Sequence, residues 1–346
     1  MYLFLKKIGH PRLVSLLSVS TLLGLFTLFS PAIADAAALV KSGFETGEFE
    51  SYGWRKSGNV PQIVRSPVCR GKYAISFPLD RHKDKTSFRT ELALAGNEAG
   101  ILKNLKYDED YWLGISIFLP PSWKPDEKST DILAQLHGVP DKNLGEVYRN
   151  PMFNFFVRGD EWFFITKRDS RPVTATDQAD MKYEEYGYRS LGKIVKGEWT
   201  SFVFQFRLSY REGEGRINVW KNGKKIVDNY RKGVGYNDQK GPYWKIGNYK
   251  PGWKPGHGET AVTRRIHYAD EVAVAMGPDR YDDVAPRCSG SSSPPQDPLP
   301  PSRPAPEPAP PEESEPEPVP EPAPAPKKEA RKPATPVIKR VVFGEP

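Results

Sequence analysis

The sequence predicts an all-β protein: an antiparallel β-sandwich of the jelly-roll type, with a site on one concave sheet face. Three observations lead to this prediction. About a dozen short segments alternate apolar and polar residues, as half-buried strands do. Residues rich in Gly, Pro, Asn and Asp separate these segments, and no long amphipathic helical pattern occurs.

The first strands are short and the next ones are strongly apolar. Tyr111–Leu119 is an apolar strand that ends at Pro120-Pro121, where the missing amide hydrogens stop ladder pairing. A Gly/Pro/Asp/Asn-rich loop follows at 138–150. The expected elements in this half are an opening strand and turn at 44–54 and strands at 73–77, 88–92, 111–119 and 131–137.

The second half contains two expected hairpins. One crosses Gly159-Asp160, and the other crosses Asn222-Gly223, a dipeptide that strongly favours a two-residue turn. Residues 169–192 lack periodicity and are expected to form an irregular loop, which can cover a binding cleft. The expected strands are 152–158, 161–167, 199–210, 216–220, 224–227, 243–249 and 265–274.

The chain divides into three segments by composition. Residues 1–34 have a basic head, an apolar run from Leu13 to Phe29 and a small-x-small motif ending at Ala34. This pattern predicts a cleaved signal peptide, with an uncleaved membrane anchor as the alternative. Residues 289–346 are rich in Pro, Glu and Ala, which predicts a disordered, extended tail. Association with a cell wall through this tail is an alternative that composition alone suggests.

Residues 35–288 are then a single folded domain, expected to be a monomer that is secreted, periplasmic or displayed at the cell surface. The chain has a formal charge of +7, most of it within this domain. An exported basic domain suits an anionic polysaccharide. A nucleic-acid partner is not expected, because no binding motif or dense basic stripe occurs. No membrane contact is expected after signal cleavage.

The only two cysteines, Cys69 and Cys288, lie near the two ends of this domain. An even number of cysteines in an exported protein predicts a disulfide. The alternative is a pair of buried free thiols.

Three expected strands, at 88–92, 134–137 and 243–249, place polar groups on one face and apolar groups on the other. If these polar faces line one sheet surface, guanidinium, amide, imidazole, ammonium and phenol groups converge there. The residues concerned are Arg89, Glu91, Gln135, His137, Lys245 and Tyr249.

The motifs Arg89-Thr-Glu-Leu92, Gln135-Leu-His137 and Tyr243-Trp-Lys-Ile-Gly-Asn-Tyr249 together resemble the signature strands of jelly-roll polysaccharide lyases. That superfamily includes alginate lyases, glucuronan lyase and the heparin lyase I group. The resemblance implies a concanavalin A-like sandwich and β-elimination on a polysaccharide that contains uronic acid. It also implies that no organic cofactor is required.

The chemistry of β-elimination explains this set of residues. Removing the C5 proton puts a second negative charge next to the uronate carboxylate, so fixed donors must stabilise it. By resemblance, Arg89 and Gln135 neutralise the carboxylate. His137 has a suitable ordinary pKa for a base, and Tyr249 suits an acid. Tyr249 can also be the base, and His137 can instead be a carboxylate partner.

Supporting roles are expected for Glu91, Lys245 and Trp253. Glu91 can fix Arg89 or Lys245 by an ion pair, and Lys245 either pairs with Glu91 or binds a substrate carboxylate. Trp253 is a candidate for stacking on a sugar ring. The histidines show no metal-ligand spacing, so no metal site is predicted, although a structural calcium in the Asp/Glu loops stays open.

Two other functions are kept as alternatives. One is a non-catalytic carbohydrate-binding module of the same fold. The other is a hydrolase with two carboxylates, which is disfavoured because Glu91 has no obvious second acid at a matching strand position. The particular polysaccharide, and endo or exo action, have no local sequence signature.

Overall fold

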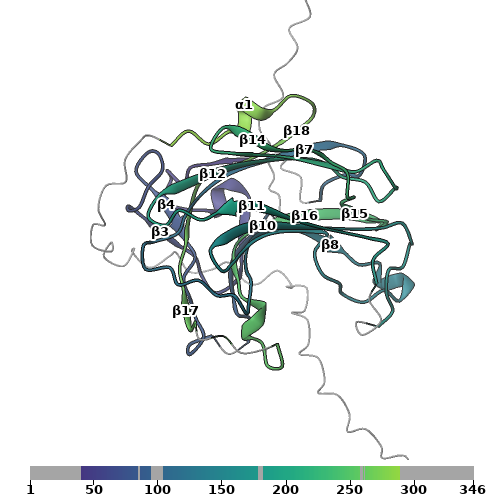
Figure 1. Cartoon of the computed structure of the whole chain (residues 1–346), viewed down its shortest axis with the longest axis horizontal. Coiled ribbons are helices and arrows are strands. Elements are labelled where there is room, and N and C mark those ends of the chain that lie inside the picture. The colour runs from purple at the N-terminus through teal and green to yellow at the C-terminus, as the bar shows by residue number, and fades with distance from the viewer. Residues whose placement is uncertain are drawn as a thin grey trace, which may run out of the picture. The chain divides into compact units, whose positions relative to one another are not determined.

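The computed structural model describes residues 40–84, 86–94, 104–177, 182–257, 260 and 262–288. The expected signal peptide and tail lie outside these residues. Figure 1 shows two large sheets stacked as layers, as a β-sandwich requires. The predicted jelly-roll class is therefore confirmed.

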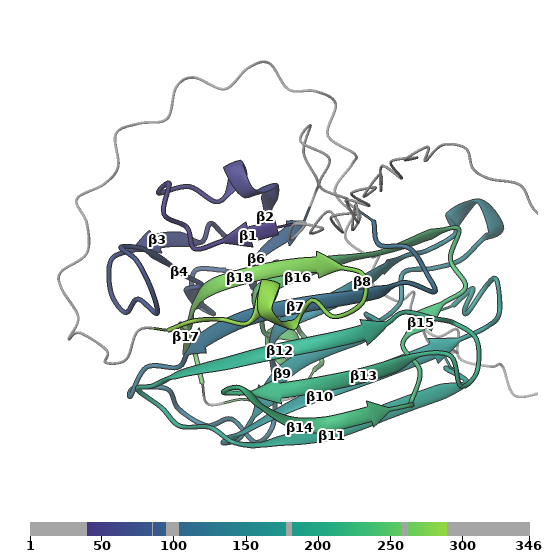
Figure 2. The ribbon, with the colours of Figure 1, turned by 90° about the horizontal axis from the view of Figure 1, so that it is seen from above.

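The upper layer in Figure 1, sheet A, follows the order β14-β13-β12-β7-β18-β4-β3, and β1 also pairs with β18. Figure 2 shows this layer from above. Its strands are β1 (Val40–Ser42), β3 (Gln62–Val64), β4 (Ala74–Ser76), β7 (Asp110–Phe118), β12 (Trp199–Arg207), β13 (Arg216–Lys221), β14 (Lys224–Tyr230) and β18 (Tyr268–Met276).

The second layer, sheet B, follows the order β11-β10-β9-β8-β16-β6-β2, and β15 runs parallel to β10. Its strands are β2 (Trp54–Gly58), β6 (Arg89–Leu94), β8 (Asp131–Val139), β9 (Phe153–Arg158), β10 (Glu161–Asp169), β11 (Glu185–Lys193), β15 (Gly235–Tyr236) and β16 (Lys240–Tyr249). A small third sheet pairs β5 (Leu79–Asp80) with β17 (Arg264–Arg265).

In the described part of the chain, the helical elements are single turns, three between strands and one after the last strand. They are η1 (Glu50–Tyr52), η2 (Lys142–Leu144), η3 (Pro251–Trp253) and α1 (Tyr281–Val284). Across the described residues, none of the helices is long and apolar enough to cross a bilayer.

The core between the layers follows from the alternation read in the sequence. Phe202, Phe204 and Phe206 of β12 are fully buried and meet the rings of β9 from the opposite sheet. The Phe204 centroid lies 5.5 Å from Phe153 and 5.1 Å from Phe155. Such aromatic pairs add to the area that the core buries. Because these rings fill the space between the sheets, the other face of sheet B, which is turned away from sheet A, is available for polar residues.

The two hairpins form where they were expected. β13 and β14 are joined by Asn222 and Gly223, with φ values of 49° and 79°, both in the left-handed region that a type I′ turn requires. β9 and β10 pair across residues 159–160.

Two predicted elements are wrong in part. The expected loop at 169–192 contains the regular strand β11, which pairs with β10 from Arg168↔Glu185 to Glu161↔Lys193. β11 is an edge strand with mostly exposed side chains, so its sequence lacks the apolar alternation of inner strands. In the expected opening strand at 44–54, a turn and η1 precede β2, which begins at Trp54.

Cys69 and Cys288 form the predicted disulfide, with a Cα–Cα distance of 4.6 Å. Cys288 lies after α1, at the end of the described residues, and its Sγ is 3.2 Å from the hydroxyl of Ser116 on β7. The bridge therefore ties the end of the domain to a segment more than two hundred residues earlier.

Candidate active site on sheet B

The three central strands of sheet B bring the predicted polar residues onto one face. β16 lies between β6 and β8, and its register pairs Tyr249 with Arg89 and Lys245 with Gln135. The intervening residues Leu92, Leu136 and Ile246 are buried in the core between the sheets. The predicted set therefore lies on the outer face of sheet B, turned away from sheet A. His137, another predicted residue of this set, pairs with Tyr243 on the same face.

Gly247 lets β16 adopt this register. It lies opposite Glu91, has a φ of +133°, and marks an irregularity of the ladder between Ile246 and Tyr249. A Cβ at this position would lie 2.4 Å from the carbonyl oxygen of Thr90. Only glycine fits the close approach of the two backbones at this φ.

Glu91 is the centre of a buried polar cluster. Its Oε2 accepts from Lys245 Nζ at 2.6 Å and lies 3.5 Å from Arg89 Nη1, and its Oε1 accepts from Gln135 Nε2. Glu91 is 1% exposed and Lys245 is 3% exposed. Both carboxylate oxygens are thus used inside the protein. This arrangement agrees with a positioning role for Glu91 and with the ion-pair alternative for Lys245, and it leaves neither residue open to bind substrate directly.

The charges of this cluster favour an anion beside it. Arg89 and Lys245 bring two positive charges, and Glu91 brings one negative charge. Burial lowers the pKa of Lys245, while the adjacent Glu91 opposes that shift. The net positive charge lies next to Gln135, whose amide has a second hydrogen besides the one donated to Glu91.

Arg89 covers the ring of Tyr249. The guanidinium carbon lies 4.2 Å from the ring centroid, and Nε donates to the carbonyl of Ser87 at 3.3 Å. Both side chains are half-buried, unlike the fully buried Glu91. A cation stacked on a ring fixes the orientation of both groups. The phenol and the guanidinium are thus held side by side at the accessible part of the site.

His137 is held as one neutral tautomer. Its Nδ1 lies 2.8 Å from the carbonyl oxygen of Gly138, which can only accept, so Nδ1 carries the proton. Nε2 then has a free lone pair and bonds to no described residue. Burial, followed by the positive charge of Lys245, lowers the pKa of His137 to about 4. The Tyr243 ring stacks on the imidazole with centroids 5.5 Å apart.

Asn154 is a polar residue of this face that the sequence analysis missed. It lies on β9 directly opposite Gln135, is 7% exposed, and its Oδ1 has no hydrogen-bond partner. Its Nδ2 likewise bonds to no described residue, so the amide can donate to a ligand beside Gln135 through Nδ2. The sequence feature that could have identified Asn154 is its position as a single asparagine in the otherwise apolar run Phe153–Val157 of an expected strand.

An apolar and aromatic strip continues the same face toward the edge of sheet B. Phe156 and Phe163 stack with centroids 5.5 Å apart, and Tyr188 lies 5.1 Å from Phe163. Arg158 donates to the Tyr188 hydroxyl at 3.3 Å. Tyr188 is 40% exposed. The strip therefore offers flat aromatic surface beside a cation that can form charge-assisted hydrogen bonds.

The predicted stacking role of Trp253 is wrong in this structure. Trp253 is 1% exposed and packs against Leu79 and Phe88. Its indole nitrogen donates to the carbonyl of Val262 at 3.0 Å. The ring has no free face for a sugar, because η3 folds back beneath the end of β16 instead of forming an open loop.

A second buried network holds the end of β16, and sequence reasoning did not find it. Lys250 follows Tyr249, is fully buried, and contacts Asp126 at 2.8 Å and Asp131 at 3.0 Å. Arg265 joins Asp131 at 2.9 Å. Asp131 begins β8, so the network ties the strand of Tyr249 to the strand of Gln135 and His137.

The described residues contain no group of three or more His, Cys, Asp or Glu side chains placed to hold a metal ion. The structural calcium stays a prediction.

The fold is a jelly-roll sandwich, and the outer face of its sheet B carries Arg89, Gln135, His137 and Tyr249. A sequence profile described as "Polysaccharide lyase" matches residues 42–273. The chain belongs to this family and is a lyase.

Solved structures agree with the fold. The chain resembles the endo-β-1,4-glucuronan lyase from the fungus Trichoderma reesei, with 18% identity, a TM-score of 0.57, and coverage of 72% of this chain and 98% of that one. It also resembles alginate lyase AlgAT5 of polysaccharide lyase family 7 (14% identity, TM-score 0.40, coverage 64% and 85%) and alginate lyase AlyC3 (13%, 0.39, 59% and 75%). No curated protein matches the chain.

Proposed function

We propose that this lyase cleaves a polysaccharide containing uronic acid by β-elimination, and that it acts outside the cytoplasm after export by residues 1–34. One observation carries the proposal: Arg89, Gln135, His137 and Tyr249 lie on one face of three adjacent strands. The glucuronan lyase of similar fold supports a uronate as the substrate.

The substrate carboxylate is bound between Arg89, Gln135 and Asn154. Arg89 supplies a charge-assisted donor, and the two amides supply neutral donors from neighbouring strands. Their donors strengthen as the carboxylate becomes a dianion in the transition state. Lys245 and Glu91 hold this arrangement from beneath, since both are buried under it.

The elimination then needs one proton acceptor and one proton donor. A base takes the C5 proton, the electron pair forms the C4–C5 double bond, and the C4–O bond breaks. The departing oxygen takes the proton of the Tyr249 hydroxyl. His137 Nε2, held unprotonated by the bond from Nδ1 to Gly138, is one acceptor. For the opposite sugar epimer, Tyr249 starts as the phenolate, takes the C5 proton, and then gives this proton to the departing oxygen. Each positioned proton transfer contributes typically about 10²–10⁴ in rate.

A product assay tests the proposal. The purified protein is incubated with glucuronan, alginate, a heparan-type chain and pectate, and the ultraviolet absorbance of unsaturated uronate is followed. The proposal expects absorbance with at least one polymer, abolished in Tyr249→Phe. Reducing ends without absorbance would indicate a hydrolase, and retention on a polymer with neither product would indicate a binding module.

A further inference from the structure

A cavity lies away from the candidate active site among the described residues. It has a volume of about 630 Å³ and is lined by residues of four chain segments: 59–62, 78–84, 120–124 and 262–266. None of its lining residues belongs to the set on the outer face of sheet B. Its size is within the range of pockets for small organic ligands.

The acceptors at this cavity are already occupied. Asp84 accepts from the side chains of Asn59 and Ser87, each at 2.7 Å, and from two backbone amides at 3.0 Å. These hydrogen bonds outweigh burial and lower the pKa of Asp84. Asp80 accepts from the amide of His82 at 2.9 Å and forms an ion pair with Arg264, whose Nε lies 3.4 Å away. Neither carboxylate is left without a donor.

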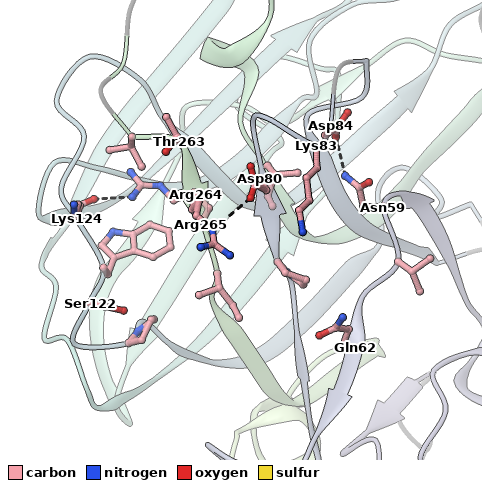
Figure 3. Close-up of a pocket in the computed structure, with 17 residues that line it drawn as sticks. Asn59, Gln62, Asp80, Lys83, Asp84, Ser122, Lys124, Thr263, Arg264 and Arg265 are labelled. Carbon is pink, nitrogen blue, oxygen red and sulfur yellow. Dashed lines mark hydrogen bonds and ion pairs between the residues drawn. The ribbon is translucent and has the colours of Figure 1, made fainter. Parts of the chain in front are cut away.

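The donors at the cavity are largely free. Lys83 is exposed, and its ammonium group has no partner among the described residues. Arg264 has an 80% exposed side chain and uses only Nε on Asp80, so its two terminal nitrogens remain available. In Figure 3, Lys83 extends into the cavity, with Asn59 and Gln62 on one side and Ser122 on the other.

This excess of free donors over free acceptors indicates the charge of the ligand that the cavity can bind. Free ammonium and guanidinium groups need an anion, and Arg pairs with a carboxylate through two parallel hydrogen bonds. Gln62, Ser122 and Thr263 add groups that bond to hydroxyls. Apolar walls from Pro78, Pro120 and Ile266 suit the non-polar face of a sugar ring. The combined chemistry is that of a short acidic saccharide.

We propose that this cavity is a second, non-catalytic binding site for an acidic saccharide segment, which Lys83 and Arg264 hold by its carboxylates. The identity of the sugar rests on the proposed function, whereas the existence of the site does not. Asn59 links the cavity to the active site, because its amide donates both to Asp84 and, at 3.0 Å, to the carbonyl oxygen of Arg89. A polymer held here is retained close to the strand of Arg89.

Calorimetry on the Tyr249→Phe protein tests the proposal with a β-1,4-linked glucuronic acid trisaccharide as the probe. We expect the Tyr249→Phe protein to bind two trisaccharides per chain. When Lys83→Gln and Arg264→Gln are added to this protein, we expect it to bind one per chain. Lys41→Gln/Lys224→Gln is the matched control, since both lysines are exposed on β1 and β14 and lose the same charge. Cellotriose, which lacks carboxylates, is expected not to occupy the cavity. Ser122→Trp fills the cavity without changing the charge. We expect this variant also to bind only one trisaccharide per chain.

Steady-state kinetics on the otherwise native protein give an independent readout. The Lys83/Arg264 pair is expected to raise KM for long polymer by about tenfold, equivalent to a loss of about 1.4 kcal/mol, and to leave kcat and trisaccharide turnover unchanged. One trisaccharide per chain before mutation, or two in both cavity variants, would overturn the second site. If the lyase assay gives no unsaturated product while calorimetry still finds two trisaccharides per chain, the proposed function is wrong and the second binding site is still supported.

Discussion

The guanidinium of Arg89 lies over the ring of Tyr249, 4.2 Å from its centroid, at the accessible part of the sheet B site. The two residues face each other across paired strands β6 and β16. A carboxylate bound by Arg89 is therefore close to the hydroxyl that can exchange a proton with the sugar. In the proposed mechanism, carboxylate binding and proton transfer therefore depend on the same pair of strands.

Replacing Arg89 should slow catalysis more than it weakens binding. Arg89→Gln removes the charged donor and the stacked cation, and we expect kcat to fall by about 10²–10³. Arg89→Lys keeps the charge but loses the planar fork, so it should restore only part of the rate. Initial rates of absorbance increase measure both variants. An Arg89→Gln enzyme with native kcat and a raised KM would contradict the assigned role.

Glu91→Gln tests whether Glu91 positions its neighbours. The variant leaves the buried Lys245 without its carboxylate at 2.6 Å and disturbs the amide of Gln135. Removing one partner of a buried ion pair typically costs about 3–5 kcal/mol of stability. We expect a lower urea midpoint and a reduced kcat, with KM little changed. Glu161→Gln is the control, because that carboxylate pairs with the exposed Lys193. Equal effects of the two substitutions would argue against a special role for Glu91.

The protonation of His137 gives a pH prediction. Its pKa is lowered to about 4, so the imidazole stays neutral across the neutral range and becomes protonated only as the pH falls through about 4. An activity that needs neutral His137 should therefore persist well below pH 6.5. The pH profile of kcat/KM checks this. An acid limb centred near 6.5 that disappears in His137→Gln would contradict it.

Lys245→Gln should raise the pKa of His137, because the Lys245 charge opposes protonation of the ring. Titration of the histidine ring signals by NMR measures the shift. His267 is the internal control, since burial alone lowers its pKa to about 3 and Lys245 does not contribute. Movement of both histidines would indicate a general loosening of the fold instead.

The Cys69–Cys288 disulfide should contribute to stability and not to chemistry. It closes a loop with a sequence separation of 219 residues. Removing it with Cys69→Ser/Cys288→Ser should cost about 2–5 kcal/mol, measured by urea unfolding. The strands of the proposed site lie in sheet B and do not include either cysteine. Turnover at a temperature where the variant stays folded should therefore match the native protein.

Much of the site follows from strand alternation in the sequence. Arg89, Gln135, His137 and Tyr249 share one face because side chains alternate along a strand, and β16 places their strands side by side. Alternation also puts Asn248 on the opposite face, where it is fully buried. Local patterns fix these orientations without knowledge of the tertiary structure.

Other features depend on contacts that no local pattern encodes. Trp253 is buried because η3 folds onto Leu79 and Phe88, residues far away in sequence. Lys250 looks like a surface lysine in the sequence, and only the approach of Asp126 and Asp131 makes it a core residue. The edge strand β11 forms because β10 offers it a partner. In each case, a tertiary contact determines whether the residue is buried or the strand forms.

Mass spectrometry of the products from glucuronan tests the central claim most directly. Elimination leaves a new non-reducing end that is lighter than a hydrolysis product by one water and absorbs in the ultraviolet. We predict only such ends from the native protein and none from Tyr249→Phe. Fully hydrated ends, or unsaturated ends produced equally well by Tyr249→Phe, would contradict β-elimination at the face formed by Arg89, Gln135, His137 and Tyr249.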